Sequence, residues 1–161
     1  MRGHEYAGVM PTVAAEKPNQ PHVLEMLRLS DEYALSLYPA DSCYMLNVSE
    51  LEQPGTTLFV ARDDNTQVVG IAAIVLRGDG SAELKRMFVL ESARGQGIAG
   101  SLLAAVEAHA VAHSVTVLQL ETGPKQLAAI ALYEKSGYAH IPNFGPYIGD
   151  EFSVCMEKRL G

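Results

Sequence analysis

Apolar and polar positions alternate along this chain in two different periods, and each period predicts one kind of secondary structure. Short apolar stretches bounded by Gly, Pro, Asn or Asp indicate strands. Such stretches predict seven strands, at residues 9–15, 57–62, 68–76, 81–89, 117–121, 138–141 and 152–159.

Four other segments carry helix signals, either apolar residues every three or four positions or the residue types that start and stop helices. They predict helices over residues 21–38, 48–53, 97–113 and 126–136. We expect Gly137 to occupy the position just past the last of these helices, where a left-handed residue ends the helix.

The predicted elements follow the order β-α-α-β-β-β-α-β-α-β-β. This order predicts an α/β architecture, in which a mixed sheet carries helices on both faces. A chain of 161 residues is long enough for one domain with a proper core and too short for two ordinary domains. We therefore expect residues 1–161 to form a single domain.

Composition and charge narrow the function classes. The apolar fraction is 48% and the charged fraction 19%, as in soluble globular proteins. The sequence has neither a membrane-spanning apolar run nor a signal peptide, and Cys43 and Cys155 have no ligand-like spacing, so a cytoplasmic location is expected. A net charge of −7 argues against nucleic acid as a partner. His109 and His113 lack a third ligand, so no metal is expected.

The most informative segment is the glycine-rich stretch between a predicted strand and the 97–113 helix. Free backbone N–H groups at a helix start, together with the helix dipole, favour phosphate oxygens. The nucleotide P-loop is excluded because no Gly-Lys-Ser/Thr ending follows. The dinucleotide fingerprint is not supported either, because no carboxylate lies about 20 residues further on. The glycines alone leave a phosphate cradle and a plain turn equally open.

The neighbouring sequence resolves this ambiguity. Residues 94–99 fit the pattern Q/R-x-x-G-x-G/A, and residues 132–137 read Leu-Tyr-Glu-Lys-Ser-Gly. Both motifs resemble those of the GNAT superfamily of N-acetyltransferases, and the resemblance covers roughly residues 57–160 in the correct order. It implies the GNAT fold, a mixed and mostly antiparallel sheet with helices on both faces. It also implies acetyl-CoA as co-substrate and acetyl transfer to an amine.

The resemblance assigns the cofactor-binding residues. The 94–100 turn would hold the pyrophosphate, and a bulged strand end would hold the pantetheine arm and polarise the thioester carbonyl through a backbone N–H. Gln126 stands where many members carry Asn, which leaves that contact in doubt. The implied residues are Met87, Phe88, Val89, Arg94, Gly95, Gln96, Gly97, Ile98, Ala99, Gly100 and Gln126.

The resemblance also implies the catalytic groups. Tyr133 occupies the position of the family's general acid, which protonates the departing thiolate. Glu121 matches the base carboxylate of some amino-terminal acetyltransferases, and Glu83 matches that of histone-type members less closely. Each carboxylate also fits an ordinary solvated strand end, so the base stays open.

Acceptor contacts are expected from the first helices and from a turn-rich segment near the C-terminus. The candidates are Tyr38, Asp41, Tyr44 and Tyr147, with Asp41 able to hold an ammonium group. The leading hypothesis is acetylation of a small-molecule primary amine, such as an amino acid or a polyamine-like compound. The alternatives are a protein N-terminal or lysine acetyltransferase and a non-catalytic acyl-CoA sensor. A homodimer is expected from the resemblance alone.

Overall fold

The computed structural model describes residues 11–161 and contains seven strands. They are β1 Thr12–Ala15, β2 Thr56–Arg62, β3 Val68–Leu76, β4 Ser81–Val89, β5 Val117–Thr122, β6 Ala139–Ile141 and β7 Val154–Arg159. The α-helices are α1 Pro21–Leu37, α2 Val48–Leu51, α3 Ile98–Ala112 and α4 Leu127–Lys135. The described part of the chain also contains three short 3-10 turns, at Ala40–Ser42, Glu91–Ala93 and Gly145–Tyr147.

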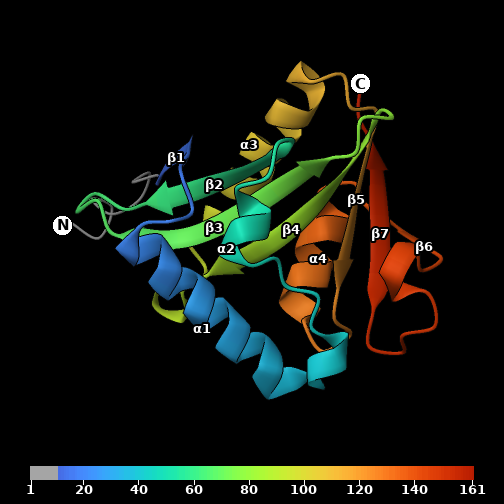
Figure 1. Cartoon of the computed structure of the whole chain (residues 1–161), viewed down its shortest axis with the longest axis horizontal. Coiled ribbons are helices and arrows are strands. Elements are labelled where there is room, and N and C mark those ends of the chain that lie inside the picture. The colour runs from blue at the N-terminus through green and yellow to red at the C-terminus, as the bar shows by residue number, and fades with distance from the viewer. Residues whose placement is uncertain (1–10) are drawn as a thin grey trace.

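The strands form one mixed sheet in the order β1-β2-β3-β4-β5-β7-β6 (Figure 1). All neighbouring strands are antiparallel except β4 and β5, which run parallel and are connected through α3. The predicted α/β class and the order of the main elements are therefore confirmed. The sheet is mixed and mostly antiparallel with helices on both faces, as the resemblance to the GNAT superfamily implies.

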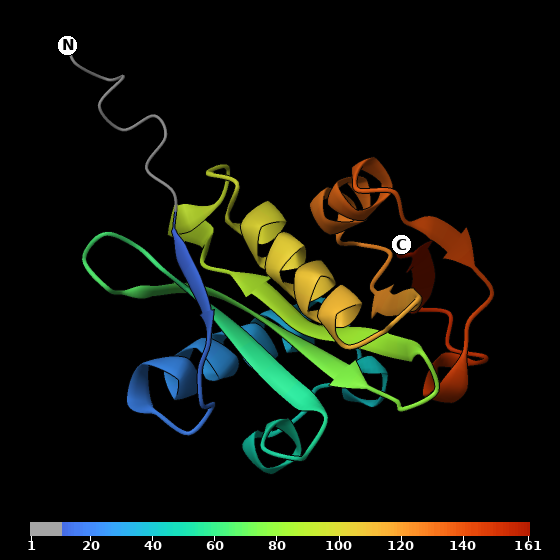
Figure 2. The ribbon, with the colours of Figure 1, turned by 90° about the horizontal axis from the view of Figure 1, so that it is seen from above.

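Helices cover both faces of the sheet, and Figure 2 shows α1 and α2 on one side with α3 and α4 on the other. Strand β3 packs against both layers, which explains why every residue from Val68 to Ile74 is buried. Gly70 lets α3 pack closely on β3 because it has no side chain: an added Cβ would lie 3.0 Å from Leu102 Cδ1 on α3. Close helix–sheet packing therefore depends on this glycine.

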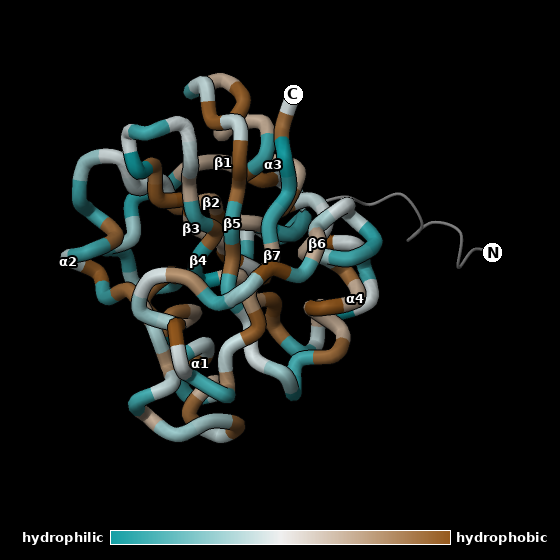
Figure 3. The backbone as a smooth tube through the Cα atoms, turned by 90° about the vertical axis from the view of Figure 1, so that its right-hand side faces the viewer, coloured by the Kyte–Doolittle hydropathy of each residue, from teal (hydrophilic) through white to brown (hydrophobic). Residues whose placement is uncertain are grey.

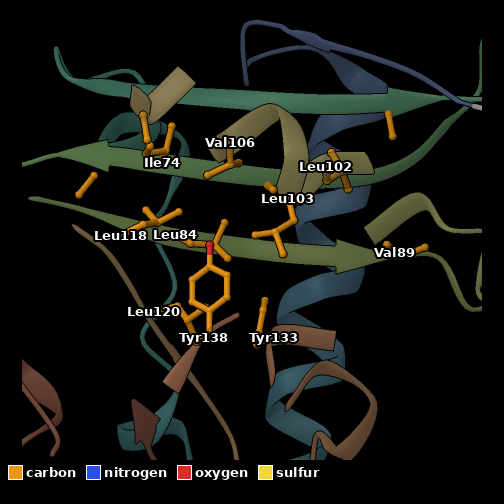
Figure 4. Close-up of a cluster of buried hydrophobic side chains, with 14 of the residues drawn as sticks. Ile74, Leu84, Val89, Leu102, Leu103, Val106, Leu118, Leu120, Tyr133 and Tyr138 are labelled. Carbon is orange, nitrogen blue, oxygen red and sulfur yellow. The ribbon is translucent and has the colours of Figure 1, made fainter. Parts of the chain in front are cut away.

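The larger core lies between the sheet and the α3–α4 layer. Figure 4 shows Leu102 and Val106 of α3 against the sheet, and Tyr133 and Tyr138 at the margin of the same cluster. Strand β5 alternates in burial along its length, and its change between apolar and polar residues is visible in Figure 3. Tyr133 therefore belongs to the hydrophobic core and also forms part of a cavity wall.

The ends of α3 and α4 follow from glycines in left-handed conformations. Gly97 has φ 79° and caps the start of α3, so the chain turns sharply from the preceding loop into the helix. Gly137, with φ 98°, follows α4 as predicted. The N–H of Tyr138 donates to the carbonyl of Tyr133 at 2.9 Å, and the N–H of Gly137 donates to Glu134 at 3.1 Å. This pair of bonds is a Schellman motif, which fixes the last turn of α4.

Where both lie within residues 11–161, the sequence-based boundaries either match the structure or differ from it by one or two residues, as expected where ends fray. The predicted start of β1 at residue 9 lies outside the described residues. The three 3-10 turns were not predicted, because single turns carry no helical periodicity. Among residues 11–161, no helix combines the length and the apolar content needed to cross a bilayer.

Candidate active site

The site begins where β4 and β5 separate. The parallel pairing runs from Ser81↔Val117 to Leu84↔Leu120 and then stops, although β4 continues to Val89. In Figure 1 the two strands lie together at one end and diverge toward the other, where α4 is seen between them. The main-chain groups on this side of β4 after Leu84 are therefore not used by β5.

A bulge accompanies this separation. The β3–β4 register passes from Ala73↔Lys85 to Ile71↔Phe88, so β4 contains one extra residue. Arg86 lies in this bulge with φ 59°, a conformation that non-glycine residues rarely adopt. The bulge therefore lies just before the expected residues Met87, Phe88 and Val89.

A cavity of about 520 Å³ opens between the end of β4, the start of α3 and the start of α4. It is lined by most of the expected cofactor residues: Met87, Phe88, Val89, Arg94, Gly95, Gly97, Ile98, Ala99, Gly100 and Gln126. The exposed side chain of Gln96 lies outside this lining, between two glycines that belong to it. We refer to this space as the cofactor cavity.

The α3 end of this cavity has the properties of an anion site. The first backbone bond within the helix runs from the Ser101 N–H to the Gly97 carbonyl, so the N–H groups of residues 98–100 precede the helical ladder. A Cβ added to Gly95, Gly97 or Gly100 would meet no protein atom within 4 Å. These positions thus open onto free space, and the residues present fit a diphosphate.

Two side chains shape the rest of this cavity. The Arg94 guanidinium lies 5.2 Å from the centre of the Tyr33 ring, and its Nε donates to the Val89 carbonyl at 3.3 Å. The Gln126 side-chain oxygen accepts hydrogen bonds from the Thr122 hydroxyl at 2.7 Å and from the Gly123 N–H at 3.2 Å. Gln126 therefore anchors the start of α4, and only its NH₂ group stays free to act as a donor toward a ligand.

A second, smaller cavity of about 140 Å³ adjoins the first and is here called the acceptor cavity. Segments distant in sequence build it: the end of α1, the turn that follows, β4, β5, α4 and Phe152 shortly before β7. The two cavities share six lining residues, Tyr33, Met87, Phe88, Gln126, Ala129 and Tyr133. A molecule in one cavity therefore lies next to a molecule in the other.

Tyr133 is 4% exposed and lines both cavities. Among the described residues, none forms a hydrogen bond with its hydroxyl group. Burial raises the pKa of Tyr133 above its ordinary value, and the nearby charge of Glu121 adds to the effect. The phenol therefore holds its proton throughout the neutral range.

Glu121 lies near the end of β5 and lines the acceptor cavity. The pKa of Glu121 is raised to about 7, chiefly by burial and to a lesser extent by the negative charges of Glu83 and Asp150. Two interactions lower the pKa of Glu121: a 2.8 Å hydrogen bond from the Ser153 hydroxyl, and the positive charge of Lys85. Near neutral pH this carboxyl group can therefore both accept and release a proton.

Glu83 lies outside the acceptor-cavity lining, in a polar cluster behind it. Its carboxylate accepts a hydrogen bond from the Tyr147 hydroxyl, pairs with Arg77 at 3.1 Å and lies 3.8 Å from Lys85 Nζ. Lys85 in turn donates to the Tyr147 hydroxyl at 2.8 Å. These contacts occupy Glu83, so Glu121 is the better placed of the two candidate bases.

The four predicted acceptor residues separate into two pairs. Tyr38 and Tyr44 line the acceptor cavity, whereas Tyr147 supports its wall through an edge-to-face contact with Tyr44 at 4.8 Å. Asp41 is exposed and lies outside the lining. The carboxylate associated with this wall is Asp150, which accepts a 2.6 Å hydrogen bond from Tyr44.

Sequence reasoning did not identify several residues of this site, among them Lys85, Arg86 and Ser153. The two cations line the acceptor cavity, and Ser153 contacts Glu121. No motif marks these residues, and an arginine gives no signal for the left-handed conformation that the bulge requires. The run of two cations in a strand was the one available signal.

Comparison with known proteins adds independent evidence. The model of the acetyltransferase (GNAT) family matches residues 23–138. An IAA acetyltransferase from Azospirillum brasilense is 43% identical over 150 residues, which cover 92% of this chain and 97% of that protein. The human N-acetylaspartate synthetase is 33% identical over 110 residues, covering 68% of this chain and 36% of that protein.

Solved structures agree with these sequence matches. A crystal structure of a protein from Klebsiella pneumoniae, described as an acyl-CoA N-acyltransferase, superposes with a TM-score of 0.81 at 33% identity, covering 96% of this chain and 100% of that one. An Elizabethkingia anophelis GNAT family acetyltransferase with acetyl-CoA bound has a TM-score of 0.67 over 93% of this chain and 98% of that one. Because the identity is only 19%, this second match supports a shared fold and nothing more. The chain belongs to the GNAT family of acetyltransferases, whose acetyl donor is acetyl-CoA.

Proposed function

We propose that this protein transfers the acetyl group of acetyl-CoA to the primary amine of a small molecule, with Glu121 as base and Tyr133 as acid. One observation carries the proposal. Tyr133 lines both cavities, while Glu121 lines the acceptor side and lies near enough for its charge to affect the phenol. Groups suited to both proton transfers therefore lie where the two substrates would meet.

The first task of the site is to bind and orient the donor. The free N–H groups at the start of α3 hold the diphosphate, and the unpaired side of β4 after Leu84 offers main-chain groups to the amides of the pantetheine arm. Bound acetyl-CoA supplies an activated acetyl group on sulfur. Tyr33, Met87 and Phe88 enclose the junction between the cavities and exclude water from it.

The second task is proton transfer. An alkyl ammonium must lose a proton before its nitrogen can attack, and a carboxyl group with a pKa of about 7 can accept it at neutral pH. The neutral amine then attacks the thioester carbonyl carbon and forms the new carbon–nitrogen bond. As the carbon–sulfur bond breaks, Tyr133 donates its phenolic proton to the sulfur, and the second proton released by the nitrogen restores the phenol. The burial that raises the pKa of the phenol also disfavours a thiolate at the same place, so this transfer remains feasible.

The size of the acceptor cavity supports a small acceptor. About 140 Å³ accommodates a compact molecule, and the walls include Tyr44 and Phe152. A relative is also named for an N-acetylated amino acid, N-acetylaspartate. A protein N-terminus or lysine remains the alternative acceptor, and peptide substrates belong in the test.

The test is release of the CoA thiol with a panel of amines, amino acids and short peptides. Tyr133→Phe is expected to lower kcat by about 100-fold or more, with the affinity for acetyl-CoA unchanged. Tyr138→Phe is the matched control, because the Tyr138 hydroxyl bonds Glu107 at 2.8 Å and lies outside both cavity linings. If acetyl-CoA binds but no compound is acetylated, the sensor alternative is correct and this proposal is wrong.

A further inference from the structure

The acceptor cavity carries two adjacent cations on one wall. Lys85 and Arg86 both line it, and their side chains are only 13% and 3% exposed. Consecutive residues of a regular strand point to opposite faces of a sheet. The bulge at Arg86, with its φ of 59°, breaks this alternation and lets both residues reach one cavity.

Arg86 has unused hydrogen-bonding capacity. Its Nη1 bonds the carboxylate of Asp31, which is 42% exposed, and its Nη2 reaches the Leu27 carbonyl at 3.4 Å. Its Nε is buried and has no partner in the described part of the chain. A buried donor without a partner is unfavourable and calls for an explanation such as a ligand. Nε and Nη2 form one edge of the guanidinium, the edge that can bind a carboxylate with two parallel bonds.

The neighbouring strand β5 supplies the complementary chemistry. Glu121 lies there, and Lys85 is near enough for its charge to act on that carboxyl group. A compact acceptor can therefore present an amine to Glu121 and an anionic group to the β4 wall at the same time. A polyamine would instead place a second ammonium group against Lys85 and Arg86, which like-charge repulsion disfavours.

We propose that the acceptor is an amino acid, whose carboxylate is held by Arg86 and Lys85 while its amine faces Glu121. This inference rests on the proposed function and narrows its substrate class. Asp31 balances the charge of Arg86 from the surface side. The guanidinium therefore offers the incoming carboxylate a donor edge rather than a fully unpaired charge.

The first experiment compares each amino acid with its own α-carboxamide. L-alanine, L-aspartate and L-methionine are assayed beside L-alaninamide, L-aspartic acid α-amide and L-methioninamide, with putrescine as a dication. An α-carboxamide lowers the basicity of the neighbouring amine, so simple amine reactivity at neutral pH favours the amide. A kcat/KM at least about tenfold higher for the best acid than for its amide therefore reports recognition of the carboxylate.

The second experiment changes the anchor. Arg86→Lys keeps a positive charge beside Asp31 but removes the guanidinium edge, and Lys85→Met keeps most of the side-chain volume while removing the charge. Each is expected to reduce the acid-to-amide ratio at least about tenfold, chiefly through KM for the acid. Arg28→Gln is the matched control, because Arg28 is an exposed cation that pairs with Glu25 and Glu32 away from the cavities. It should leave the ratio unchanged.

The outcomes separate this inference from the proposed function. Acid preference that is lost in either anchor variant supports the inference, and the second variant serves if the first does not fold. Equal use of acids and amides, preference for putrescine, or full acid preference in both anchor variants would overturn it, while amine acetylation stands. Absence of acetylation of any compound, with acetyl-CoA bound, would overturn the proposed function itself.

Discussion

The two cavities that meet at Tyr133 are built in different ways. The N-terminal end of α3 and the glycines before it supply main-chain N–H groups to the cofactor cavity from one continuous stretch of chain. The acceptor cavity takes its polar groups from side chains on α1, β4 and β5 and beside β7. The first region therefore provides fixed dipoles, whereas the second provides groups that titrate or pair with each other. Donor binding should thus tolerate pH change, and acceptor chemistry should not.

The largest effect is expected from a charge placed in the cofactor cavity. Gly100→Glu puts a carboxylate at the start of α3, where open space surrounds the added side chain. We expect the affinity for acetyl-CoA, measured by calorimetry, to fall by about 100-fold or more, because the carboxylate competes with and repels the diphosphate.

The same substitution should not destabilise the fold. Replacing a glycine inside a helix stabilises the helix by about 1 kcal/mol. An acidic residue in the first turn stabilises it further through the helix dipole. Gly100→Gln has nearly the same volume without the charge and serves as the control. Loss of affinity as large in Gly100→Gln as in Gly100→Glu would mean that bulk, not anion binding, governs this position.

The next effect concerns Glu121 in the acceptor cavity. Glu121→Gln is expected to lower kcat/KM for the amine by about 100-fold near neutral pH, because the base is lost. The affinity for acetyl-CoA should stay unchanged, since Glu121 lies outside the cofactor-cavity lining. Unchanged turnover would exclude Glu121 as the base.

Glu121 also makes stability depend on pH. Its pKa is raised from 4.5 to about 7 in the folded protein, so the folded state holds this proton more tightly than the unfolded state. The resulting stabilisation is fully present below about pH 4.5 and is lost as the pH rises through about 7. Above that range Glu121→Gln should be more stable than the natural protein by about 1–3 kcal/mol in denaturant unfolding. At about pH 4.5 the difference should largely vanish.

A smaller effect should follow from filling the space beside Tyr38. A Cβ added to Gly123 would lie 2.0 Å from the Tyr38 hydroxyl oxygen, which accepts a hydrogen bond from the Lys125 N–H. Gly123→Ala is expected to destabilise the fold by about 1–3 kcal/mol through overpacking and to raise KM for the amine. Gly100→Ala is the control, because its Cβ meets no protein atom within 4 Å. Equal melting temperatures for the two variants would contradict the close contact.

The smallest expected effect is a displacement of the pH profile. The Ser153 hydroxyl donates to the Glu121 carboxylate, so Ser153→Ala removes a bond that favours the ionised form and raises the pKa of Glu121 further. The rising limb of kcat/KM for the amine should move to higher pH by less than about one unit. Ser153 is thus a positioning residue. Ser153→Thr should restore the profile, whereas a merely structural role would lower the rate equally at every pH.

The sequence predicted most of the fold because its main signals are local. Turn residues separate the strands, and Gly137 ends α4 in the expected conformation. The position of the β4 bulge was harder to predict from the sequence. Arg86 adopts a left-handed conformation that neither its chemistry nor its neighbours indicate, and an ion pair with α1 helps to hold it.

The site was predictable to the extent that it consists of contiguous chain. The glycine turn at 95–100 and Tyr133 carry motifs that the sequence shows directly. The acceptor side depends on contacts between distant residues, such as Tyr44 with Asp150, 106 positions apart. Asp41 seemed the natural carboxylate from its place in the loop, yet it is exposed, because burial in a loop depends on packing that no local pattern encodes.

The fixed ends of α4 restrict which changes in length this protein can accept. The Gln126 side chain joins one end of the helix to Thr122 and Gly123, and the Schellman bonds hold the other. Because each residue of an α-helix turns the chain by about 100°, one inserted residue between 127 and 132 would rotate the phenol away from both substrates without unfolding the helix. Functional homologues of this chain should therefore conserve the number of residues from Gln126 to Gly137, while insertions and deletions collect in exposed turns away from both cavities, such as residues 64–67 between β2 and β3.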